Sequence, residues 1–231
     1  MLIKLQKSMI KLLSIADLIT LTNVIFGFMA IIMVFLHEIR FSFSFILLAL
    51  LADGLDGIVA RKTRKGELGE YFEAMADMTS LGIAPAIFVY AVYHDAISYC
   101  IYYSSYLIIV LVLFLLMSAI RLASFHIMKD KNFFVGLPAS ASTIIILTLS
   151  FFGIEFLYIL TIIIIVSIVM VSNVRFPKPG LRMDALAALL IILTLVLGRN
   201  YSDAAPLILL SMIMIYIVAG PIYLWKTKDK L

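Results

Sequence analysis

The chain alternates long apolar stretches with short polar ones, and this alternation predicts eight helices that cross a membrane. A helix needs about 20 mostly apolar residues to cross the hydrocarbon core of a bilayer. The second and third stretches are the least apolar, because both carry carboxylates near the polar segment that joins them. The predicted spans cover residues 14–36, 41–62, 70–93, 97–128, 137–153, 155–172, 183–198 and 204–225.

Composition supports a membrane protein. Hydrophobic residues make up 64% of the 231 positions and charged residues only 14%, whereas apolar residues form about 45–50% of a typical soluble domain. The mean hydropathy is +1.15. The chain is therefore predicted to be all-α, a polytopic helix bundle that is integral to a membrane. Its one cysteine, Cys100, excludes an intrachain disulfide and a cysteine-based metal site.

The basic residues predict how the bundle is oriented. Lysine and arginine gather in short cytoplasmic loops, and all but two of the 18 basic residues fall in alternate connecting segments or at the chain ends. Only Arg40 and Arg199 fall on the other side. Both termini are predicted to be cytoplasmic, as is the segment between the second and third spans. Because topology accounts for the positive charge, we do not expect nucleic acid to be a partner.

The first residues predict a short helix that lies in the membrane interface instead of crossing it. Within residues 1–13, one helical face carries leucines and a methionine, and the other carries Lys4, Lys7 and Lys11. Such a helix is attracted to anionic lipid. A cleaved signal peptide is the alternative, but no small-residue cleavage site follows and the apolar run is too long for one.

Four carboxylates lie within the second and third predicted spans, where an ionised side chain is costly and usually functional. Asp53 and Asp56 are three residues apart and share one helical face, and Glu73 and Asp77 are four apart and share another. Asp53 and Asp77 each lie about 12 Å from the cytoplasmic end of their helix, at 1.5 Å per residue. The two pairs are therefore predicted to lie at the same depth.

If these two spans pack as antiparallel neighbours, their acidic faces can meet and place four oxygen ligands in one cavity. Four negative charges that close need neutralising, and Mg²⁺ or Mn²⁺ usually occupy carboxylate sites, so the pattern predicts a site for two divalent metal ions. Gly54, Gly57 and Ala60 leave room for a ligand, and Arg61 can pair with a phosphate. A carboxylate-based cation transporter is the alternative function. For the small residues, the alternative role is close packing of helices. For Arg61 and the basic residues that follow it, the alternative is an ordinary cytoplasmic loop rich in positive charge.

The stretch DGLDGIVARKTRKGELGEYFEAMAD, from Asp53 to Asp77, resembles the signature of the CDP-alcohol phosphotransferase family. That signature reads D-x-x-D-G-x-x-A-R, a short spacer, and then G-x-x-x-D-x-x-x-D. Seven of its eight defining positions match, and Glu73 stands where the family has aspartate. The matching positions are Asp53, Asp56, Gly57, Ala60, Arg61, Gly69 and Asp77.

Further stretches are similar to one branch of this family, the membrane-embedded phosphatidylserine and archaetidylserine synthases of bacteria and archaea. The chain departs from that branch at His126 and Ser140, which affects the assignment of the substrate more than that of the chemistry. The similar stretches are ITLTNVIFGFMAI from Ile19, LGIAPA from Leu81, RLASFHI from Arg121, FVGLPAS from Phe134 and IVMVSNVRFPK from Ile168.

The resemblance implies a fold and a reaction. The fold would be a six-helix membrane core, here residues 14–180, between the interfacial residues 1–13 and an additional helix pair in residues 181–231. The reaction would transfer the phosphatidyl group of CDP-diacylglycerol or CDP-archaeol onto the hydroxyl of L-serine and release CMP. Synthesis of phosphatidylglycerophosphate or of an inositol lipid is the alternative within the family. Since CDP and serine are water-soluble, the active site of this cell-membrane protein is expected just inside the cytoplasmic boundary.

The resemblance also implies roles for individual residues. Asp53, Asp56 and Glu73 would be ligands of Mg²⁺ or Mn²⁺, and Asp77 would be both a ligand and the general base for the serine hydroxyl. Glu73 is expected to keep metal binding but to alter or reduce turnover, because its extra methylene displaces the oxygens by about 1 Å. Family members are commonly dimers, so a homodimer is expected. Around the CDP group we expect Gly57, Ala60, Arg61 and Gly69.

Other polar residues near the cytoplasmic helix ends are candidates for contacts with substrate. Arg121 is the candidate for binding the serine carboxylate, with Lys131 and Arg182 behind it. A charge that snorkels from the end of its helix is the alternative. Thr22 and Asn23 are candidates for contacting the nucleotide or diphosphate of the CDP-lipid, and helix packing is the alternative for both.

Overall fold

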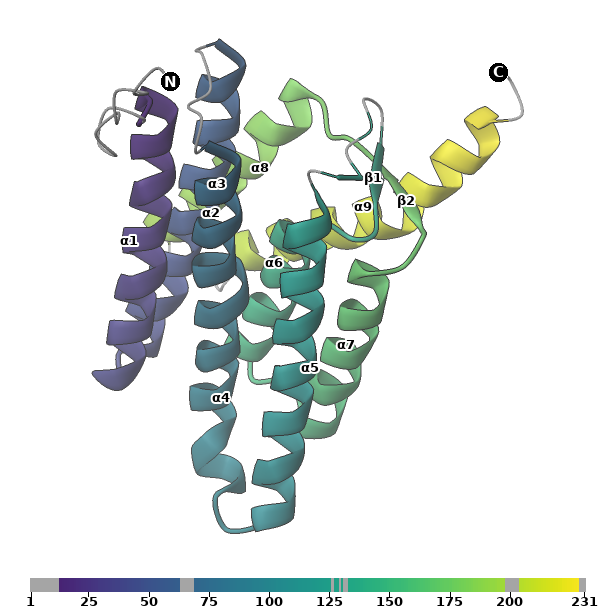
Figure 1. Cartoon of the computed structure of the whole chain (residues 1–231). Coiled ribbons are helices and arrows are strands. Elements are labelled where there is room, and N and C mark those ends of the chain that lie inside the picture. The colour runs from purple at the N-terminus through teal and green to yellow at the C-terminus, as the bar shows by residue number, and fades with distance from the viewer. Residues whose placement is uncertain are drawn as a thin grey trace, which may run out of the picture.

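Helices dominate the structure, a computed structural model (Figure 1) that describes residues 13–62, 69–125, 127–128, 130, 133–197 and 204–228. A π-helical segment, η2 (Met78–Ile83), joins α3 to α4 without a break, so Gly69–Ile97 is one continuous rod. The resulting eight helical rods match the eight apolar stretches in order, and the predicted all-α bundle is confirmed. The α-helices are α1 (Ile15–Phe35), α2 (Ile39–Lys62), α3 (Gly69–Asp77), α4 (Ala84–Ile97), α5 (Ile101–Phe125), α6 (Ala139–Phe151), α7 (Phe156–Met170), α8 (Leu181–Leu197) and α9 (Ala204–Lys228).

Among the described residues, four rods are long and apolar enough to span a membrane by themselves. Helices α6 and α7 are apolar too, but they have only 13 and 15 residues, fewer than the about 20 that a span needs. The chain is a multi-pass membrane protein whose middle helices are shorter than their predicted spans. The four long rods are Asp17–Phe35, Gly69–Ile97, Ile101–Phe125 and Ala204–Lys226.

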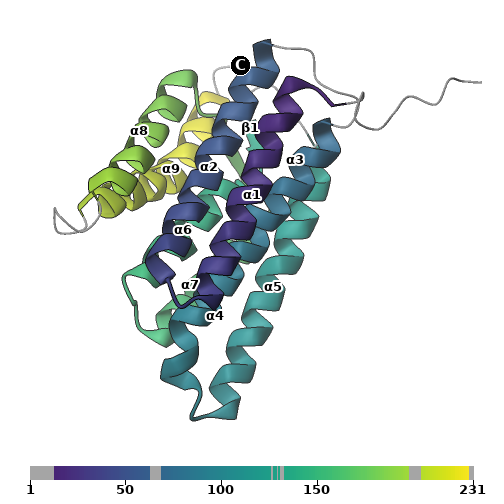
Figure 2. The same ribbon diagram turned by 90° about the vertical axis from the view of Figure 1, so that its left-hand side faces the viewer.

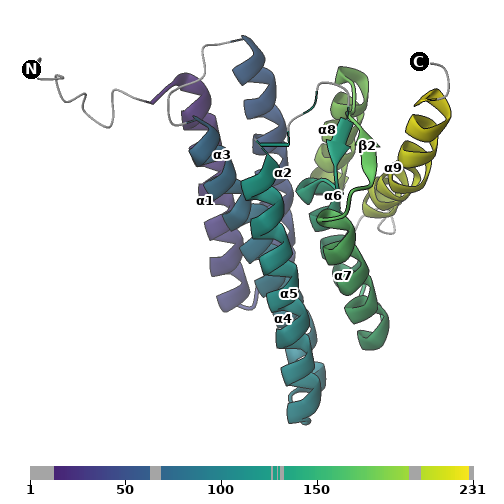
Figure 3. The ribbon, with the colours of Figure 1, turned by 45° about the vertical axis from the view of Figure 1, so that its right-hand side comes forward.

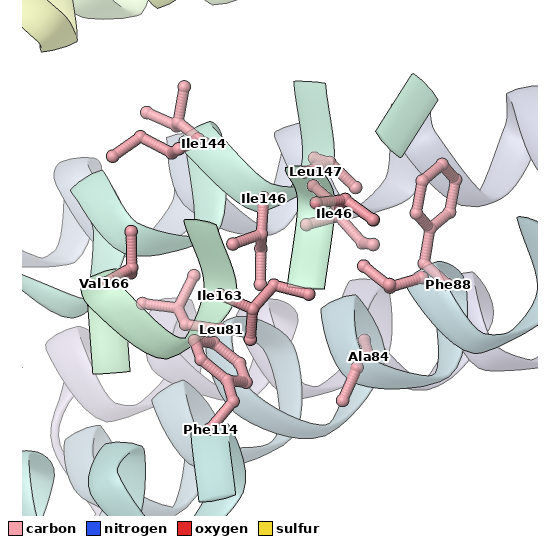
Figure 4. Packing of buried hydrophobic residues seen from close by; sticks show 14 of the residues in the cluster. Ile46, Leu81, Ala84, Phe88, Phe114, Ile144, Ile146, Leu147, Ile163 and Val166 are labelled. Atoms are coloured by element: carbon pink, nitrogen blue, oxygen red, sulfur yellow. The ribbon is translucent and has the colours of Figure 1, made fainter. Parts of the chain in front are cut away.

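The short helix α6 is shielded by its neighbours. Every residue from Ala141 to Thr148 is buried, as expected for a helix that is apolar on all sides. Helices α4, α7 and α9 pack around it, and Figure 4 shows Ile146 of α6 in the same cluster as Phe88 of α4 and Ile163 of α7. Because other helices enclose α6, its length does not have to match the thickness of a bilayer.

The helix ends are arranged as the alternating basic segments predict. In Figure 1 the start of α1, the end of α2, the start of α3 and the end of α9 all lie at the upper end of the bundle. The turns between α1 and α2, between α4 and α5, and between α6 and α7 lie at the lower end. The segments expected to be cytoplasmic therefore share one end. Residues 1–12 of the predicted interfacial helix lie outside the described residues.

A small antiparallel sheet, which the sequence did not predict, lies at the same upper end. Strand β1 (Phe133–Val135) pairs with strand β2 (Arg175–Pro177), and helix α9 packs against β2. The Tyr216 hydroxyl of α9 donates to the carbonyl of Pro177 at 2.9 Å, and a Cβ on Gly220 would lie 2.8 Å from Pro177 Cδ. Figure 3 shows α9 on the side of the bundle away from α1. The C-terminal helix is thus packed into the fold.

Candidate active site

One face of α1 carries the contacts that build the site. Its buried residues recur every three or four positions, as expected for a single stripe of a helix that faces the protein interior. Figure 2 shows α1 in front, with α2 on one side and α3 on the other, and α1 packs against both. Helix α1 therefore links the two helices that carry the signature carboxylates. The stripe consists of Asp17, Thr20, Asn23, Gly27, Ala30 and Val34.

Within this stripe, Asn23 contacts the last carboxylate of the signature. Its Nδ2 donates a hydrogen bond of 3.1 Å to Oδ1 of Asp77. Asn23 is fully buried, at 0% exposure, and Asp77 is half-buried at the end of α3. Within the described part of the chain, the buried Oδ1 of Asn23 has no hydrogen-bond partner. Leaving a buried acceptor unpaired costs about 1–3 kcal/mol.

Two further contacts fix α1 against the rod that begins with α3. One turn further along α1, a Cβ added to Gly27 would lie 2.9 Å from the Cα of Ser80, so the two backbones touch. At the start of α1, Asp17 forms a capping box with Ser14, and a Cβ on Gly69 would lie 3.1 Å from Asp17 Oδ1. Helices α1 and α3 thus run side by side in the same direction.

The helix widens immediately after Asp77. The first N–H after η2 donates to the carbonyl of Thr79, five residues back instead of four. Pro85 has no N–H for the Leu81 carbonyl four residues before it, and Thr143 of α6 donates its hydroxyl to that carbonyl at 2.8 Å. π-Helical turns are rare and frequently lie at functional sites. The backbone therefore marks the position of Asp77 independently of the signature.

The other signature carboxylates lie on either side of α1. Asp53 of α2 and Glu73 of α3 are both half-buried. The second and third predicted spans do pack directly against each other, because α2 contacts η2 and α4 of the rod, but over the described ranges α2 and α3 hardly touch. Near the carboxylates, α1 packs against both helices. Among the side chains that the structure describes, no three acidic, histidine or cysteine residues meet in a metal-binding group. Outside the described side chains lie those of Asp56, Gly57, Ala60 and Arg61 of α2.

Thr22 and Asn23 are neighbours in sequence but lie on different faces of α1. The Thr22 side chain is exposed, and its hydroxyl donates to the carbonyl of Ile19 in its own helix at 2.6 Å. Of the two, only Asn23 belongs to the buried stripe. Both residues were predicted from the sequence to contact the CDP-lipid, whereas in the structure only Asn23 faces the protein interior.

Arg121, the candidate for binding the serine carboxylate, is enclosed by protein. It is 7% exposed, and its Nε donates to the carbonyl of Leu137 at 3.2 Å. The guanidinium carbon lies 5.3 Å from the centre of the Phe125 ring, a position that favours a cation. A group held in this way differs from a snorkelling charge, whose head stays in water. Arg182 is exposed at the start of α8, and Lys131 lies outside the described residues.

Similarity to known proteins covers most of the chain. A family model described as CDP-alcohol phosphatidyltransferase matches residues 13–174, which include α1 to α7. A CDP-diacylglycerol–serine O-phosphatidyltransferase of Methanocaldococcus jannaschii is 32% identical over 169 residues, which are 73% of this chain and 76% of that protein. A protein of the same name from Helicobacter pylori is 28% identical over 225 residues, 88% of each chain. An archaetidylserine synthase of Methanothermobacter thermautotrophicus is 31% identical over 182 residues, 75% of this chain and 73% of that protein.

Proposed function

The chain belongs to the CDP-alcohol phosphatidyltransferase family, and on this premise we propose that it transfers the phosphatidyl group of a CDP-linked lipid to the hydroxyl of L-serine and releases CMP. Two relatives are named for serine and CDP-diacylglycerol, and a third is named an archaetidylserine synthase. The lipid is accordingly proposed to be built on diacylglycerol or archaeol. The observation that carries the proposal is the signature, whose last carboxylate, Asp77, contacts a buried amide where the helix widens.

Four side chains are proposed to hold two divalent metal ions, Mg²⁺ or Mn²⁺. The donor set fits hard cations, because all of its members are carboxylates. Asp53, Glu73 and Asp77 are half-buried, and ionised groups that are partly buried within a membrane protein need a compensating charge. Bound there, the ions would offset the charge of the diphosphate and stabilise the departing CMP. The proposed ligands are Asp53, Asp56, Glu73 and Asp77.

Asp77 is also the proposed general base. Its carboxylate would take the proton of the serine hydroxyl while the serine oxygen forms a bond to the lipid phosphorus. The bond between that phosphorus and the oxygen that bridges to CMP breaks, so its electron pair leaves with CMP and the proton stays on Asp77. Arg61 would bind a phosphate of the CDP group. Gly57, Ala60 and Gly69 would leave space for that group.

Recognition of serine is proposed to use Arg121. The forked donors of an arginine match a carboxylate in shape and charge, and burial against Leu137 and Phe125 holds this one in place. Lys131 and Arg182 would add positive charge around the approach of the acceptor. The site is proposed to face the cytoplasm, where CDP and serine are dissolved, and the protein is proposed to act as a homodimer.

One assay tests the reaction. Purified protein would receive Mn²⁺ or Mg²⁺, CDP-diacylglycerol or CDP-archaeol, and serine, glycerol 3-phosphate or inositol, with release of CMP as the readout. We expect metal-dependent release with serine alone among the acceptors. Release with glycerol 3-phosphate or inositol would reassign the acceptor. No CMP with any acceptor would contradict the proposal, and cation flux across vesicles without CDP-lipid would favour a transporter.

A further inference from the structure

A buried amide lies against the proposed base with only its donor side engaged. Asn23 donates from Nδ2 to Oδ1 of Asp77, while its own buried Oδ1 has no partner within the described part of the chain. A leucine of similar size at this position would bring no unpaired acceptor of its own, although Asp77 Oδ1 would lose this donor. The hydrogen bond that the Asn23 side-chain N–H donates to Asp77 is therefore what offsets the cost of burying the unpaired Oδ1 of Asn23.

The helix that carries this amide is fixed in register with the rod that carries Asp77. Gly27 lies four residues after Asn23, and Ser80 lies three residues after Asp77, so the two contacts are one helical turn apart. At Gly27 the backbones are so close that an added Cβ would lie 2.9 Å from Ser80 Cα. This contact sets both the separation and the axial position of the two helices. The Asn23 amide consequently has one place relative to the Asp77 carboxylate.

We propose that Asn23 is a positioning residue, which orients the Asp77 carboxylate for the reaction and does not bind the nucleotide. This rests on the proposed function, in which Asp77 is the base. A carboxylate with one oxygen held by a rigid donor cannot rotate freely, so its second oxygen keeps one direction. Orientation matters here, because a misplacement of about 1 Å at a reacting group can lower the rate about 10²-fold.

Steady-state kinetics separate positioning from binding. We expect Asn23→Leu, at saturating Mn²⁺ and serine, to lower kcat about 10²-fold while KM for the CDP-lipid stays unchanged. The matched control is Ser42→Ala, which alters a fully buried polar residue of α2 about 16 Å along the helix from Asp53 and should leave kcat unchanged. A raised KM for CDP-lipid with normal kcat would identify Asn23 as a nucleotide contact. A kcat within about threefold of wild type would also overturn the proposal.

A reciprocal exchange tests the contact by thermal stability as well as by activity. Asn23→Asp places two carboxylates against each other, whereas Asn23→Asp combined with Asp77→Asn restores one amide and one carboxylate. With divalent metal chelated, we expect Asn23→Asp to lower Tm by at least about 3 °C and the double variant to recover most of that loss, yet to remain inactive because the carboxylate is on the wrong helix. A double variant no more stable than Asn23→Asp would overturn the proposal.

The two measurements also separate this inference from the proposed reaction. If wild-type protein released no CMP from any acceptor while the exchange restored stability, the reaction would fail but the Asn23–Asp77 contact would stand. If the exchange failed while wild-type protein released CMP, the reaction would stand and the positioning role would fall.

Discussion

Alanine at position 27 should push α1 away from the rod that carries Asp77. The added Cβ would lie 2.9 Å from both Cα and Cβ of Ser80 and 3.2 Å from its nitrogen, whereas non-bonded carbons settle at about 3.5–4.0 Å. Because the obstacle is backbone, α1 must retreat by about 0.6–1.1 Å. Overpacking of this kind costs about 1–3 kcal/mol, of which the better helix propensity of alanine offsets up to about 1 kcal/mol.

The same retreat should weaken the hydrogen bond one turn away. The Asn23–Asp77 bond is 3.1 Å long, and beyond about 3.5 Å it would no longer count as a hydrogen bond. We therefore expect Gly27→Ala to lower Tm by about 2–8 °C and to lower kcat by about tenfold or more. Thermal unfolding in detergent and release of CMP measure the two effects.

Gly54→Ala is the matched control for stability. Gly54 lies in α2, and a Cβ added there would meet nothing within 4 Å, so Tm should stay level or rise through helix propensity. Suppose instead that Gly27→Ala unfolds at the same temperature as Gly54→Ala and turns over as fast as wild type. That result would show that the close approach of α1 to η2 does not constrain the site, and the predicted retreat of α1 would be wrong.

Three further substitutions and one removal of metal test the fold and the site. Thr143→Val should lower Tm, because the Leu81 carbonyl loses its hydroxyl partner at a cost of about 1–3 kcal/mol; Thr161→Val, which removes an exposed intrahelical bond, is the control. Glu73→Asp should raise the rate of CMP release and keep Mn²⁺ binding, measured by electron paramagnetic resonance. A slower variant would contradict the expectation that glutamate at this position reduces turnover. Asp77→Asn should lower kcat at least about 10²-fold, and EDTA should abolish CMP release by wild-type protein until Mn²⁺ is added back.

The helices could be predicted because their signal is local. A stretch either has enough consecutive apolar residues to form a span or does not, and each of the eight stretches is helical in the structure. The sheet depends instead on two three-residue strands from distant parts of the chain, which are too short to show a period-two pattern. The π-helical segment η2 was missed as well. Pro85, which has no N–H for the Leu81 carbonyl, was its one visible cue.

The common depth of the carboxylates stays a prediction from counting residues, and the partners of these carboxylates could not be predicted in that way. Asn23 and Asp77 are 54 positions apart, and nothing in either segment specifies that they meet. The short connection between the second and third spans predicted that they pack against each other, and α2 does pack against η2 and α4. It did not predict that α1 packs against both α2 and α3 beside the carboxylates. Asp17 was also missed, although SIAD, from Ser14, fits the capping-box pattern with an acidic residue at its last position. That pattern would have predicted the start of α1.

The contacts of α1 also limit how the longer side chain of Glu73 can be accommodated. Gly69, the first residue of α3, lies against Asp17, and Asp77, the last, is held by Asn23, so Glu73 lies midway between two fixed points. The helix cannot slide to compensate for an extra methylene without breaking one of these contacts. Only rotation about the side-chain bonds of Glu73 can then return its carboxylate to the position that an aspartate carboxylate would take. Holding that one rotamer costs side-chain entropy. Compared with aspartate, glutamate at position 73 should therefore change where the carboxylate lies, and hence turnover. The stability of the fold should be little affected.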